Sequence, residues 1–481
     1  MYSIEIIRWK FNGNPTEIID DDGKDCYDTF NMRPKKRRFG QRFFQSIVLN
    51  LRWLLPGIGV KRWILLILAG TTLLGVGFAV LILDVYRTAP DTWWLPIISF
   101  LSLRFIDRTL RGLIFGGAGI ALIIVGFIGL NRTLLRPFVR PGANLIDTVS
   151  EYRRRERGPR IVVIGGGTGL SALLRGLKEY SRNITAVVTV ADNGGSSGEL
   201  RKSIGILPPG DIRNCLAALS NDEELLTQLF QYRFAEGAGL NGHSLGNLLI
   251  TALTGLTGSF EEGVAEMGRV LAVQGDVFPS TLHNVNLCAD IQLADKNVEV
   301  EIEGESQISG IGGKINRVWL DPANPAAFPP TVQAILGADL IIVGPGSLYT
   351  SLLANLLVPD LRDAIRASRA AKFYICNVAT QPGETEHFTC NDHVRTIEQH
   401  IGGKVFDLMI CNTNQQGILP KGIDWVKVNP DEEMRVPVYR SDLVDSGNPS
   451  HHDSAKLARA VMDLYLEKTG PLNTKEATSQ L

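Results

Sequence analysis

The sequence predicts a doubly wound α/β domain preceded by two transmembrane α-helices. Beyond residue 160, short apolar runs alternate with helical patterns, and several runs end in glycine-rich loops. Two long uncharged stretches lie earlier in the chain. Strands that are buried on both faces of a parallel sheet have this continuous apolar character, and their alternation with helices is typical of α/β folds. With 481 residues, the chain is long enough for two or three domains.

The two uncharged stretches, 64–83 and 112–130, are the predicted membrane spans. Each is long enough to cross a hydrocarbon core of roughly 30 Å as a helix. Lys and Arg are dense in the N-terminal tail and after the second stretch, so the positive-inside rule predicts a hairpin with both termini in the cytoplasm. The expected location is the cell membrane, as a multi-pass protein with a cytoplasmic main domain. Two buried core helices are the alternative.

The predicted organisation has five parts. They are a basic cytoplasmic tail (1–60), the membrane hairpin (61–135), an Arg-rich linker (136–157), the ligand-binding α/β domain (158–467) and a flexible tail (468–481). The basic stretch around Lys35 is expected either to contact anionic lipid headgroups or to be a solvated tail, and both interpretations stay open. The net charge of −1 argues against a nucleic-acid partner.

The apolar runs of the α/β domain are its expected strands. They lie at Ile161–Ile164, Ile184–Val190, Leu340–Val343, Phe373–Val378 and Leu408–Cys411. Leucines at helical spacing predict a helix over Leu170–Tyr180, and a helix over Ala455–Leu466 is expected to close the domain. Val and Glu alternate from Val298 to Ile302, which predicts a half-exposed antiparallel strand in an insertion.

Glycine-rich loops follow the first two expected strands. The first loop runs from Gly165 to Ser171 and the second from Asp192 to Gly198. Backbone N–H groups in such loops and at helix N-termini bind phosphate, so two of them on neighbouring strands indicate a crevice for a ligand with two or more phosphates. Leu170 stands where a dinucleotide fingerprint has its third glycine. A nicotinamide dehydrogenase, with Asp192 binding ribose, remains an alternative.

Four later segments supply polar groups to the same crevice. They are LPPGDIRN (207–214), GHSLGN (242–247), GPGSLYTS (344–351) and CNVATQPGET (376–385). Asp211 is placed to cap a helix, and Arg213 to reach a phosphate. His243 and Asn247 are four residues apart and project from one helix face. Ser347 is expected at a helix N-terminus, where it can hold an anion or a sugar hydroxyl.

The six cysteines are scattered and show no CxxC spacing. Cys376 and Cys411 lie at the ends of expected strands. This pattern predicts a reduced cytosolic compartment and no structural zinc. The pair His451-His452 has no other metal-ligand spacing around it and is expected at the surface.

Six motifs of this sequence, in the order in which they occur, resemble those of the YvcK-type gluconeogenesis factors, which are relatives of the CofD 2-phospho-L-lactate transferases. The motifs are GGGTGLS, VADNGGSSGELR, LPPGDIRN, GHSLGN, GPGSLYTS and CNVATQPGET. The resemblance covers about 158–467 and does not include the membrane hairpin. It implies a modified Rossmann-like fold that binds a nucleotide diphosphate compound.

The resemblance implies two functions. The YvcK branch implies a UDP-sugar-binding regulator of cell shape, required under gluconeogenic growth, with cell-wall or central-metabolism proteins as partners and a homo-oligomeric state. The CofD branch implies a phosphotransferase that moves a 2-phospholactyl group from a guanosine diphosphate carrier to a deazaflavin, with Mg²⁺. The GGSSG and PPGDIRN segments are closer to the YvcK branch, so a membrane-anchored regulator is the expected function. Whether the ligand is turned over stays open.

The candidate site residues follow from the loops and the resemblance together. The nucleotide-binding candidates are Gly166, Gly167, Thr168, Asp192, Asn193, Ser196, Ser197, Asp211, Asn214, His243, Asn247, Gly346, Ser347 and Asn377. Asp192 and Asp211 are the candidate Mg²⁺ ligands and, with His243, the catalytic candidates if the protein is an enzyme. Family members usually have two adjacent aspartates here, whereas this chain has Asp192-Asn193. The lost carboxylate weakens the transferase interpretation, although the asparagine carbonyl can still coordinate a metal.

Overall fold

The structure is a computed structural model, and the chain divides into two compact units, Met1–Gly126 and Phe127–Leu481. Within the part of the chain that the structure describes, no helix is both long enough and apolar enough to cross a membrane. The expected spans 64–83 and 112–130, the N-terminal tail and most of the linker fall largely outside that part. The described residues are 154–469 without 221–223, 238, 294–297 and 430–432, together with single residues and short runs between 68 and 124.

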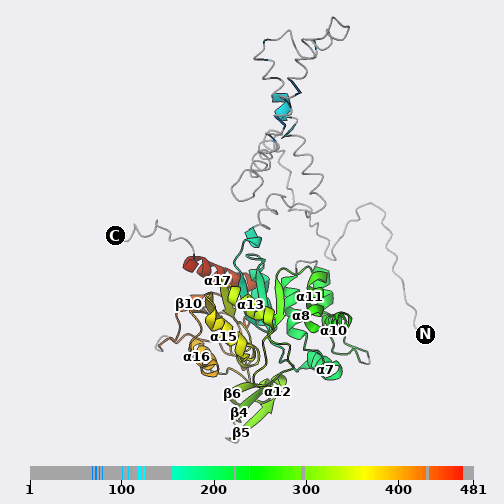
Figure 1. The fold of residues 1–481 in the computed structure, drawn as a ribbon. Coiled ribbons are helices and arrows are strands. Elements are labelled where there is room, and N and C mark those ends of the chain that lie inside the picture. Colours follow the sequence, from blue (N-terminus) through cyan, green and yellow to red (C-terminus); the bar gives the residue numbers. More distant parts are fainter. Residues whose placement is uncertain are drawn as a thin grey trace, which may run out of the picture. The chain divides into compact units, whose positions relative to one another are not determined.

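A seven-stranded parallel sheet forms the centre of the second unit (Figure 1). Its strand order is β10-β9-β8-β7-β1-β2-β3, and the neighbouring strands pair in parallel. The chain builds one half of the sheet outward from β1 and the other half outward from β7, which is the arrangement of a Rossmann-like fold. The strands are β1 (Ile161–Gly165), β2 (Ile184–Val188), β3 (Asp276–Pro279), β7 (Leu340–Val343), β8 (Ala371–Ile375), β9 (Leu408–Asn412) and β10 (Val438–Ser441).

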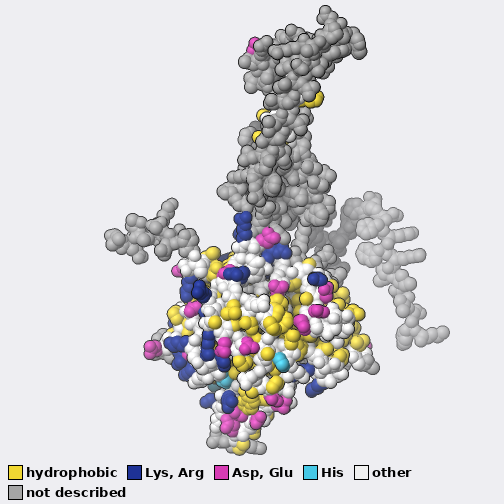
Figure 2. Space-filling model, in the orientation of Figure 1, with side chains coloured by type: hydrophobic (Ala, Val, Ile, Leu, Met, Phe, Trp, Pro, Cys, Tyr) yellow, Lys and Arg dark blue, Asp and Glu magenta, His cyan; other side chains and the backbone are white. Residues whose placement is uncertain are grey.

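Helices cover both faces of this sheet, which confirms the predicted doubly wound α/β class. The helices are α6 (Gly167–Leu177), α7 (Gly195–Ile204), α8 (Gly210–Leu219), α9 (Glu224–Gln231), α10 (Leu245–Thr257), α11 (Phe260–Val270), α12 (Glu305–Ile311), α13 (Pro329–Gly337), α14 (Ala354–Leu356), α15 (Pro359–Ala367), α16 (Cys390–Ile401) and α17 (Ser454–Thr469). A π-helical segment, η3 (Leu348–Leu353), directly precedes α14. On the face drawn in Figure 2, acidic and basic side chains are interspersed over the described part of this unit, so neither sign of charge dominates there.

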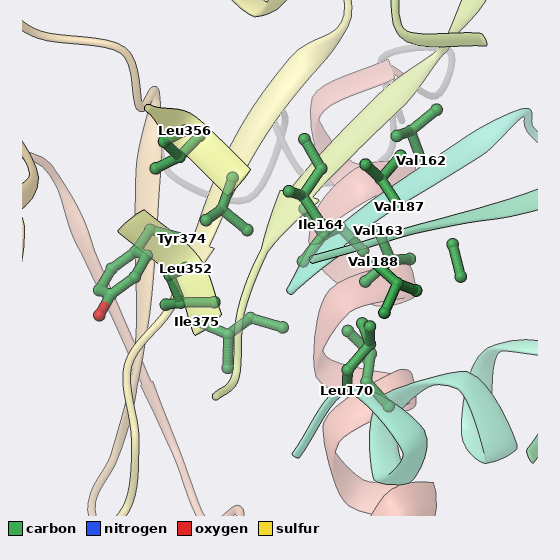
Figure 3. Close-up of a cluster of buried hydrophobic side chains, with 14 of the residues drawn as sticks. Val162, Val163, Ile164, Leu170, Val187, Val188, Leu352, Leu356, Tyr374 and Ile375 are labelled. Atoms are coloured by element: carbon green, nitrogen blue, oxygen red, sulfur yellow. The ribbon is translucent and has the colours of Figure 1, made fainter. Parts of the chain in front are cut away.

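The core lies between the sheet and its helices. Figure 3 shows Val162 and Ile164 of β1 beside Val187 and Val188 of β2, with Leu170 of α6 packed nearby. Every residue of β1 is buried, which accounts for its continuous apolar sequence. The closing helix α17 packs directly on α6, where a Cβ atom on Gly176 would lie 2.1 Å from the Ser454 carbonyl oxygen. This contact requires glycine.

A second, three-stranded sheet is inserted between β3 and β7. Its order is β5-β4-β6, from β4 (Asn286–Gln292), β5 (Glu299–Glu303) and β6 (Lys314–Asp321), and both pairings are antiparallel. Exposed glutamates alternate with partly buried Val300 and Ile302 along β5. The half-exposed antiparallel strand predicted from the Val/Glu alternation is therefore confirmed.

Candidate functional site

The loops after β1 and β7 pack against each other where the strand order changes direction. A Cβ atom on Gly169 would lie 2.9 Å from the Pro345 carbonyl oxygen, and one on Gly346 would lie 3.2 Å from the Gly166 carbonyl oxygen. Open α/β sheets bind ligands at this topological switch point, outside the carboxyl ends of the strands. The first glycine loop and the GPGSLYTS segment are thus neighbours, and with the loops described next we call them the switch-point loops (165–169, 192–197, 209–211 and 344–347).

Glycine residues also let the turn at 208–211 (PPGD) approach both glycine loops. A Cβ atom on Gly166 would lie 2.5 Å from Oδ2 of Asp211, and one on Gly210 would lie 2.4 Å from Oγ of Ser197. The same position on Gly210 is 3.2 Å from Oδ2 of Asp192. The turn therefore brings Asp211 to the first loop, and Gly210 to the Asp192 carboxylate.

The helices that follow the two glycine loops begin without side-chain caps. Gly166 and Gly194 occupy the N-cap positions of α6 and α7, and neither can accept a hydrogen bond through a side chain. The next residues, Gly167 and Gly195, have φ values of 66° and 46°, in the left-handed region that favours glycine. Two N–H groups at these loops are already used, because the Gly167 N–H donates to the Asp211 carboxylate and the Gly194 N–H donates to Oδ1 of Asp192. The other N–H groups of the first turns lack an intrahelical acceptor and are the kind of donor that binds anions.

Four carboxylates act on one another beside these loops. Burial, followed by the negative charge of Asp192, raises the pKa of Asp211 to about 6. Burial raises the pKa of Glu305 to about 8, with contributions from Asp192, Asp211 and Glu384. Mg²⁺ binds carboxylate oxygens together with substrate phosphates, and a cation would relieve this mutual repulsion. Asp192 and Asp211 are the two carboxylates nearest the glycine loops, and their oxygens are donors of the kind that Mg²⁺ prefers.

Ser196, His243 and Asn247 form one buried network that joins the second glycine loop to the GHSLGN segment. Oγ of Ser196 lies 3.0 Å from Nδ1 of His243 and accepts a 3.0 Å hydrogen bond from Nδ2 of Asn247. On the other side of the ring, Nε2 of His243 lies 3.3 Å from Oε2 of Glu199. Oδ1 of Asn247 is buried and has no hydrogen-bond partner among the described residues. The network positions the start of α7 and contains an acceptor that a ligand could use.

Two side chains that were predicted to bind the ligand instead form hydrogen bonds with the backbone of neighbouring segments. Oδ1 of Asn377 accepts from the Gly346 N–H at 3.2 Å, and its Nδ2 donates to the Gly346 carbonyl oxygen at 2.9 Å. Oδ1 of Asn193 accepts from the N–H of Ser306, at the start of α12, at 3.0 Å. Both amides thus position loops. The Asn193 side chain faces α12 with its oxygen.

The remaining candidates divide between the loop surface and internal contacts. Thr168 is exposed in the first turn of α6. Oδ1 of Asn214 accepts a 2.9 Å hydrogen bond from the Arg213 guanidinium. Oγ of Ser347 accepts a 2.9 Å hydrogen bond from Nε2 of Gln381. The fourteen candidates lie in these loops or in the elements packed against them. The side chains of Asn193, Asn214, Ser347 and Asn377 hydrogen-bond within the protein, as do those of the Ser196 network.

Several side chains beside the loops were not among the predicted candidates. Glu384 accepts hydrogen bonds from the Tyr349 N–H at 3.2 Å and from Oγ1 of Thr350 at 2.9 Å, so it anchors the start of η3. Glu305 begins α12, and Glu199 lies three residues after Ser196 on α7. Only Glu199 had a local signal, because an i,i+3 spacing places it on the same helix face as Ser196.

A cavity of about 530 Å³ lies beside α11 and β3, away from these loops. Its lining includes Glu261, Arg269, Asp276 and Phe328, and it contains none of the fourteen candidates. Neither of the two glycine loops lines it, and the helix N-terminus at its wall, that of α11, has the Ser259 cap and the acidic side chains of Glu261 and Glu262. The switch-point loops therefore remain the stronger candidate for a phosphate-containing ligand.

Comparisons with known proteins agree on the α/β domain. A family model described as "2-phospho-L-lactate transferase CofD" matches residues 161–444. The "Gluconeogenesis factor" of Bacillus subtilis is 46% identical over 321 residues, which cover 64% of this chain and 99% of that protein. The protein of the same name from Listeria monocytogenes is 42% identical over 329 residues, 67% of this chain and 100% of its own.

A solved structure extends the similarity to three dimensions. The crystal structure of a UPF0052-family protein from Bacillus halodurans is 43% identical in sequence, with a TM-score of 0.59. The match covers 64% of this chain and 99% of that protein.

Proposed function

Since this chain belongs to the CofD family, and relatives that it covers almost completely are named gluconeogenesis factors, we propose that it binds a UDP-sugar-type nucleotide diphosphate at the switch-point loops. In this proposal the nucleotide-bound form of the protein regulates cell shape under gluconeogenic growth, without turnover of the nucleotide. The observation that carries the proposal is the meeting of the Gly166 and Gly346 loops, with Asp211 and the start of α7 beside them.

The two uncapped helix N-termini support the diphosphate part of the proposal. The first turns of α6 and α7 offer backbone N–H groups, and the helix dipole adds partial positive charge at the same positions. Neither N-cap residue has a side chain of its own that would compete with a phosphate for these N–H groups, and Asp211 is the carboxylate beside the Gly166 N-cap. A ligand with two phosphates would use both helix ends at once.

The carboxylates at the loops would repel a diphosphate that carried no cation. Asp192 and Asp211 would hold Mg²⁺, which supplies positive charge between the carboxylates and the phosphates. Ser196 and Ser197 at the start of α7 would then donate to phosphate oxygens, and Thr168 would do so from α6. This arrangement predicts that nucleotide binding depends on a divalent cation.

Isothermal titration of the full-length chain with UDP-N-acetylglucosamine tests the proposal. We expect saturable binding with Mg²⁺ and weaker binding with a chelator. Ser196→Ala should weaken binding, whereas Ser259→Ala, which removes the serine cap of α11, should not. No heat at millimolar nucleotide sugar with Mg²⁺ would overturn the proposal, and stronger binding of a guanosine diphosphate compound would overturn the choice of base.

A CofD-like transferase is the second candidate function, and the Asp192–Asp211 pair favours it. A carboxyl whose pKa is raised to about 6 near a second carboxylate is suited to metal-assisted group transfer. The experiment is incubation of the chain with a guanosine diphosphate carrier of 2-phospholactate, a deazaflavin acceptor and Mg²⁺. Formation of the transferred product, and its loss in Asp192→Ala, would establish the transferase, whereas no product would favour the regulator.

The membrane hairpin is part of the same proposal and rests on the sequence of 64–83 and 112–130. It would hold the α/β domain at the cytoplasmic face of the membrane, near precursors of the cell wall. Fractionation of cells tests it: we expect the chain in the membrane fraction after washes with high salt and alkaline carbonate. Recovery in the soluble fraction would contradict the hairpin and leave the nucleotide proposal untouched.

A further inference from the structure

Three cysteine thiols meet at one point of the α/β domain, apart from the switch-point loops. Cys376 directly follows β8, Cys411 lies in β9, and Cys390 is the first residue of α16. Their Sγ atoms lie within 4.8 Å of one another, and each residue is at most 1% exposed. Three separate elements therefore deliver sulfur to the same buried place.

The other described cysteines do not share this arrangement. Cys215 lies in α8 and Cys288 in β4, and all five described cysteines are free thiols. A buried free cysteine usually packs as a small apolar side chain, which needs no second sulfur beside it. A cluster of three thiols is instead the donor set that soft or borderline metal ions select.

The dimensions of the cluster fit a bound metal ion. Zinc–thiolate bonds of about 2.3 Å place the sulfur atoms of one site roughly 3.8 to 4 Å apart. The observed limit of 4.8 Å between the Sγ atoms requires only a small inward movement. Rotation about the χ1 torsions of three cysteines would provide that movement without a change of backbone.

The charges around the cluster favour zinc over a monovalent ion. Arg440 pairs with Cys411 across the β9–β10 register, and its positive charge acts on both Cys390 and Cys411. Three thiolates and Zn²⁺ carry a net charge of −1, which one guanidinium offsets. The same thiolates with Cu⁺ would carry −2 and leave a buried charge uncompensated. The N-terminus of α16, at Cys390, adds partial positive charge.

A buried histidine lies one turn further along α16. Nδ1 of His393 lies 2.8 Å from the Thr389 carbonyl oxygen, to which it donates as Nδ1–H. Its Nε2 is buried and has no hydrogen-bond partner among the described residues. Structural zinc sites are almost always four-coordinate, and a neutral imidazole with a free Nε2 is a common ligand. His393 lies outside the 4.8 Å group and is the candidate for the fourth ligand.

We propose that Cys376, Cys390 and Cys411 form a structural zinc site that fastens α16 to β8 and β9. This departs from the expectation of no structural zinc, which considered only cysteines close together in sequence. Each thiol that becomes a ligand releases its proton to solvent as its sulfur–zinc bond forms. Because the cluster is buried, the ion is taken up as the domain folds, and its binding energy contributes to folding. The site also fixes the residue before Asn377, the side chain that holds Gly346.

Metal analysis of the full-length chain tests the proposal. Protein purified without chelator from zinc-replete cells should contain about one zinc ion per chain by elemental mass spectrometry. Cys390→Ser should reduce the zinc content at least tenfold, whereas Cys288→Ser, at a buried cysteine outside the cluster, should retain it. Zinc-free wild-type protein, or equal zinc in the two variants, would overturn the site. Copper in place of zinc would overturn the charge argument.

A spectroscopic measurement on the unmutated chain covers the case in which Cys390→Ser fails to fold. Protein produced in cobalt-supplemented, zinc-depleted medium should show thiolate-to-cobalt charge-transfer absorption, and added zinc should abolish it. Absence of this absorption from folded, cobalt-containing protein would overturn the thiolate assignment. In His393→Gln, unchanged cobalt spectra would remove His393 as the fourth ligand, and altered ligand-field bands would support it.

Discussion

Arg160 and Asp339 form a two-pronged ion pair at the amino ends of β1 and β7. The Arg160 guanidinium reaches Oδ1 of Asp339 at 2.8 Å and Oδ2 at 3.2 Å, and the Arg160 backbone N–H donates to the same Oδ2 at 2.8 Å. The carboxyl ends of these two strands carry the first glycine loop and the GPGSLYTS segment. The pair therefore aligns the strands from the end opposite the candidate site.

Asp339→Asn should cause a small loss of stability and no loss of nucleotide binding. The bond from Arg160 holds the pKa of Asp339 below its ordinary value. A carboxyl with a depressed folded pKa stabilises the fold above its unfolded pKa, and this stability is lost as pH falls through the folded value. Chemical unfolding should therefore show a larger wild-type advantage at pH 7 than at pH 3, because pH 3 lies below the unfolded pKa of 3.8. An equal difference at both values would contradict the ion-pair explanation.

Asp211→Asn should stabilise the metal-free protein at neutral pH. The folded pKa of about 6 lies above the ordinary value of 3.8, so the carboxyl favours folding below pH 3.8 and loses that contribution as pH rises through 6. Removal of the charge should raise the free energy of unfolding at pH 8 by on the order of 2–3 kcal/mol, since one pKa unit corresponds to roughly 1.4 kcal/mol.

Denaturant unfolding at several pH values measures this effect. The advantage of Asp211→Asn should shrink toward pH 4, where the wild-type carboxyl is itself protonated. Magnesium should stabilise the wild type but not the variant, because the amide replaces a proposed metal ligand. A variant that is less stable than the wild type at pH 8 would show that the Asp211 charge is compensated within the fold.

Gly166→Ala should abolish or strongly weaken nucleotide binding. The added methyl group would lie 2.5 Å from the Asp211 carboxylate and 3.1 Å from Oγ of Ser351, so both side chains must move. Gly166 has an extended φ of −171°, which alanine adopts without strain, and the effect is therefore on the loops. Titration calorimetry measures binding, with circular dichroism to confirm folding.

Gly255→Ala is the matched control for that substitution. A Cβ atom there meets nothing within 4 Å, and Gly255 lies inside α10. Alanine should stabilise this helix by roughly 0.5–1 kcal/mol through its higher helix propensity and leave nucleotide binding unchanged. Equal loss of binding in both variants would show that the Gly166 effect is not local.

Asn193→Asp should not improve metal binding, although it places a second aspartate beside Asp192. Oδ1 of Asn193 accepts from the Ser306 N–H, so a carboxylate there would face the start of α12. It would also add negative charge beside Glu305, whose pKa is already raised to about 8. We expect a lower thermal midpoint and unchanged Mg²⁺ affinity by calorimetry. Tighter Mg²⁺ binding would mean that the side chain can turn toward Asp192.

The central strands could be predicted from sequence because they are buried on both faces. The predicted Leu340–Val343 matches β7, and β1 extends the predicted run by only one residue. The edge strands β3 and β10 were not predicted, since each has four residues and contains polar or proline residues within its bounds. Short edge strands lack both the length and the continuous apolar character that mark a central strand.

The site was predictable as a set of loops but not in the roles of its side chains. Strand–loop–helix order places the loops at one edge of the sheet. The roles of Asn193 and Asn377 depend on contacts with Ser306 and Gly346, which are distant in sequence. His452 was expected at the surface beside His451, but it is 7% exposed, with Nε2 3.2 Å from the Cys376 carbonyl oxygen. After β10 the chain reverses direction, and an antiparallel bridge between Val444 and His452 brings the histidine into the interior.

The direct pairing of β1 with β7 has a consequence for how the domain can be divided. All of the chain from α6 to α13 lies between two strands that are hydrogen-bonded neighbours. A fragment that ends before Leu340 would contain both glycine loops. It would lack β7 and the loop after it, against which the first glycine loop packs. Neither half of this domain is a smaller version of the whole, so a shortened form that binds the ligand must keep both halves.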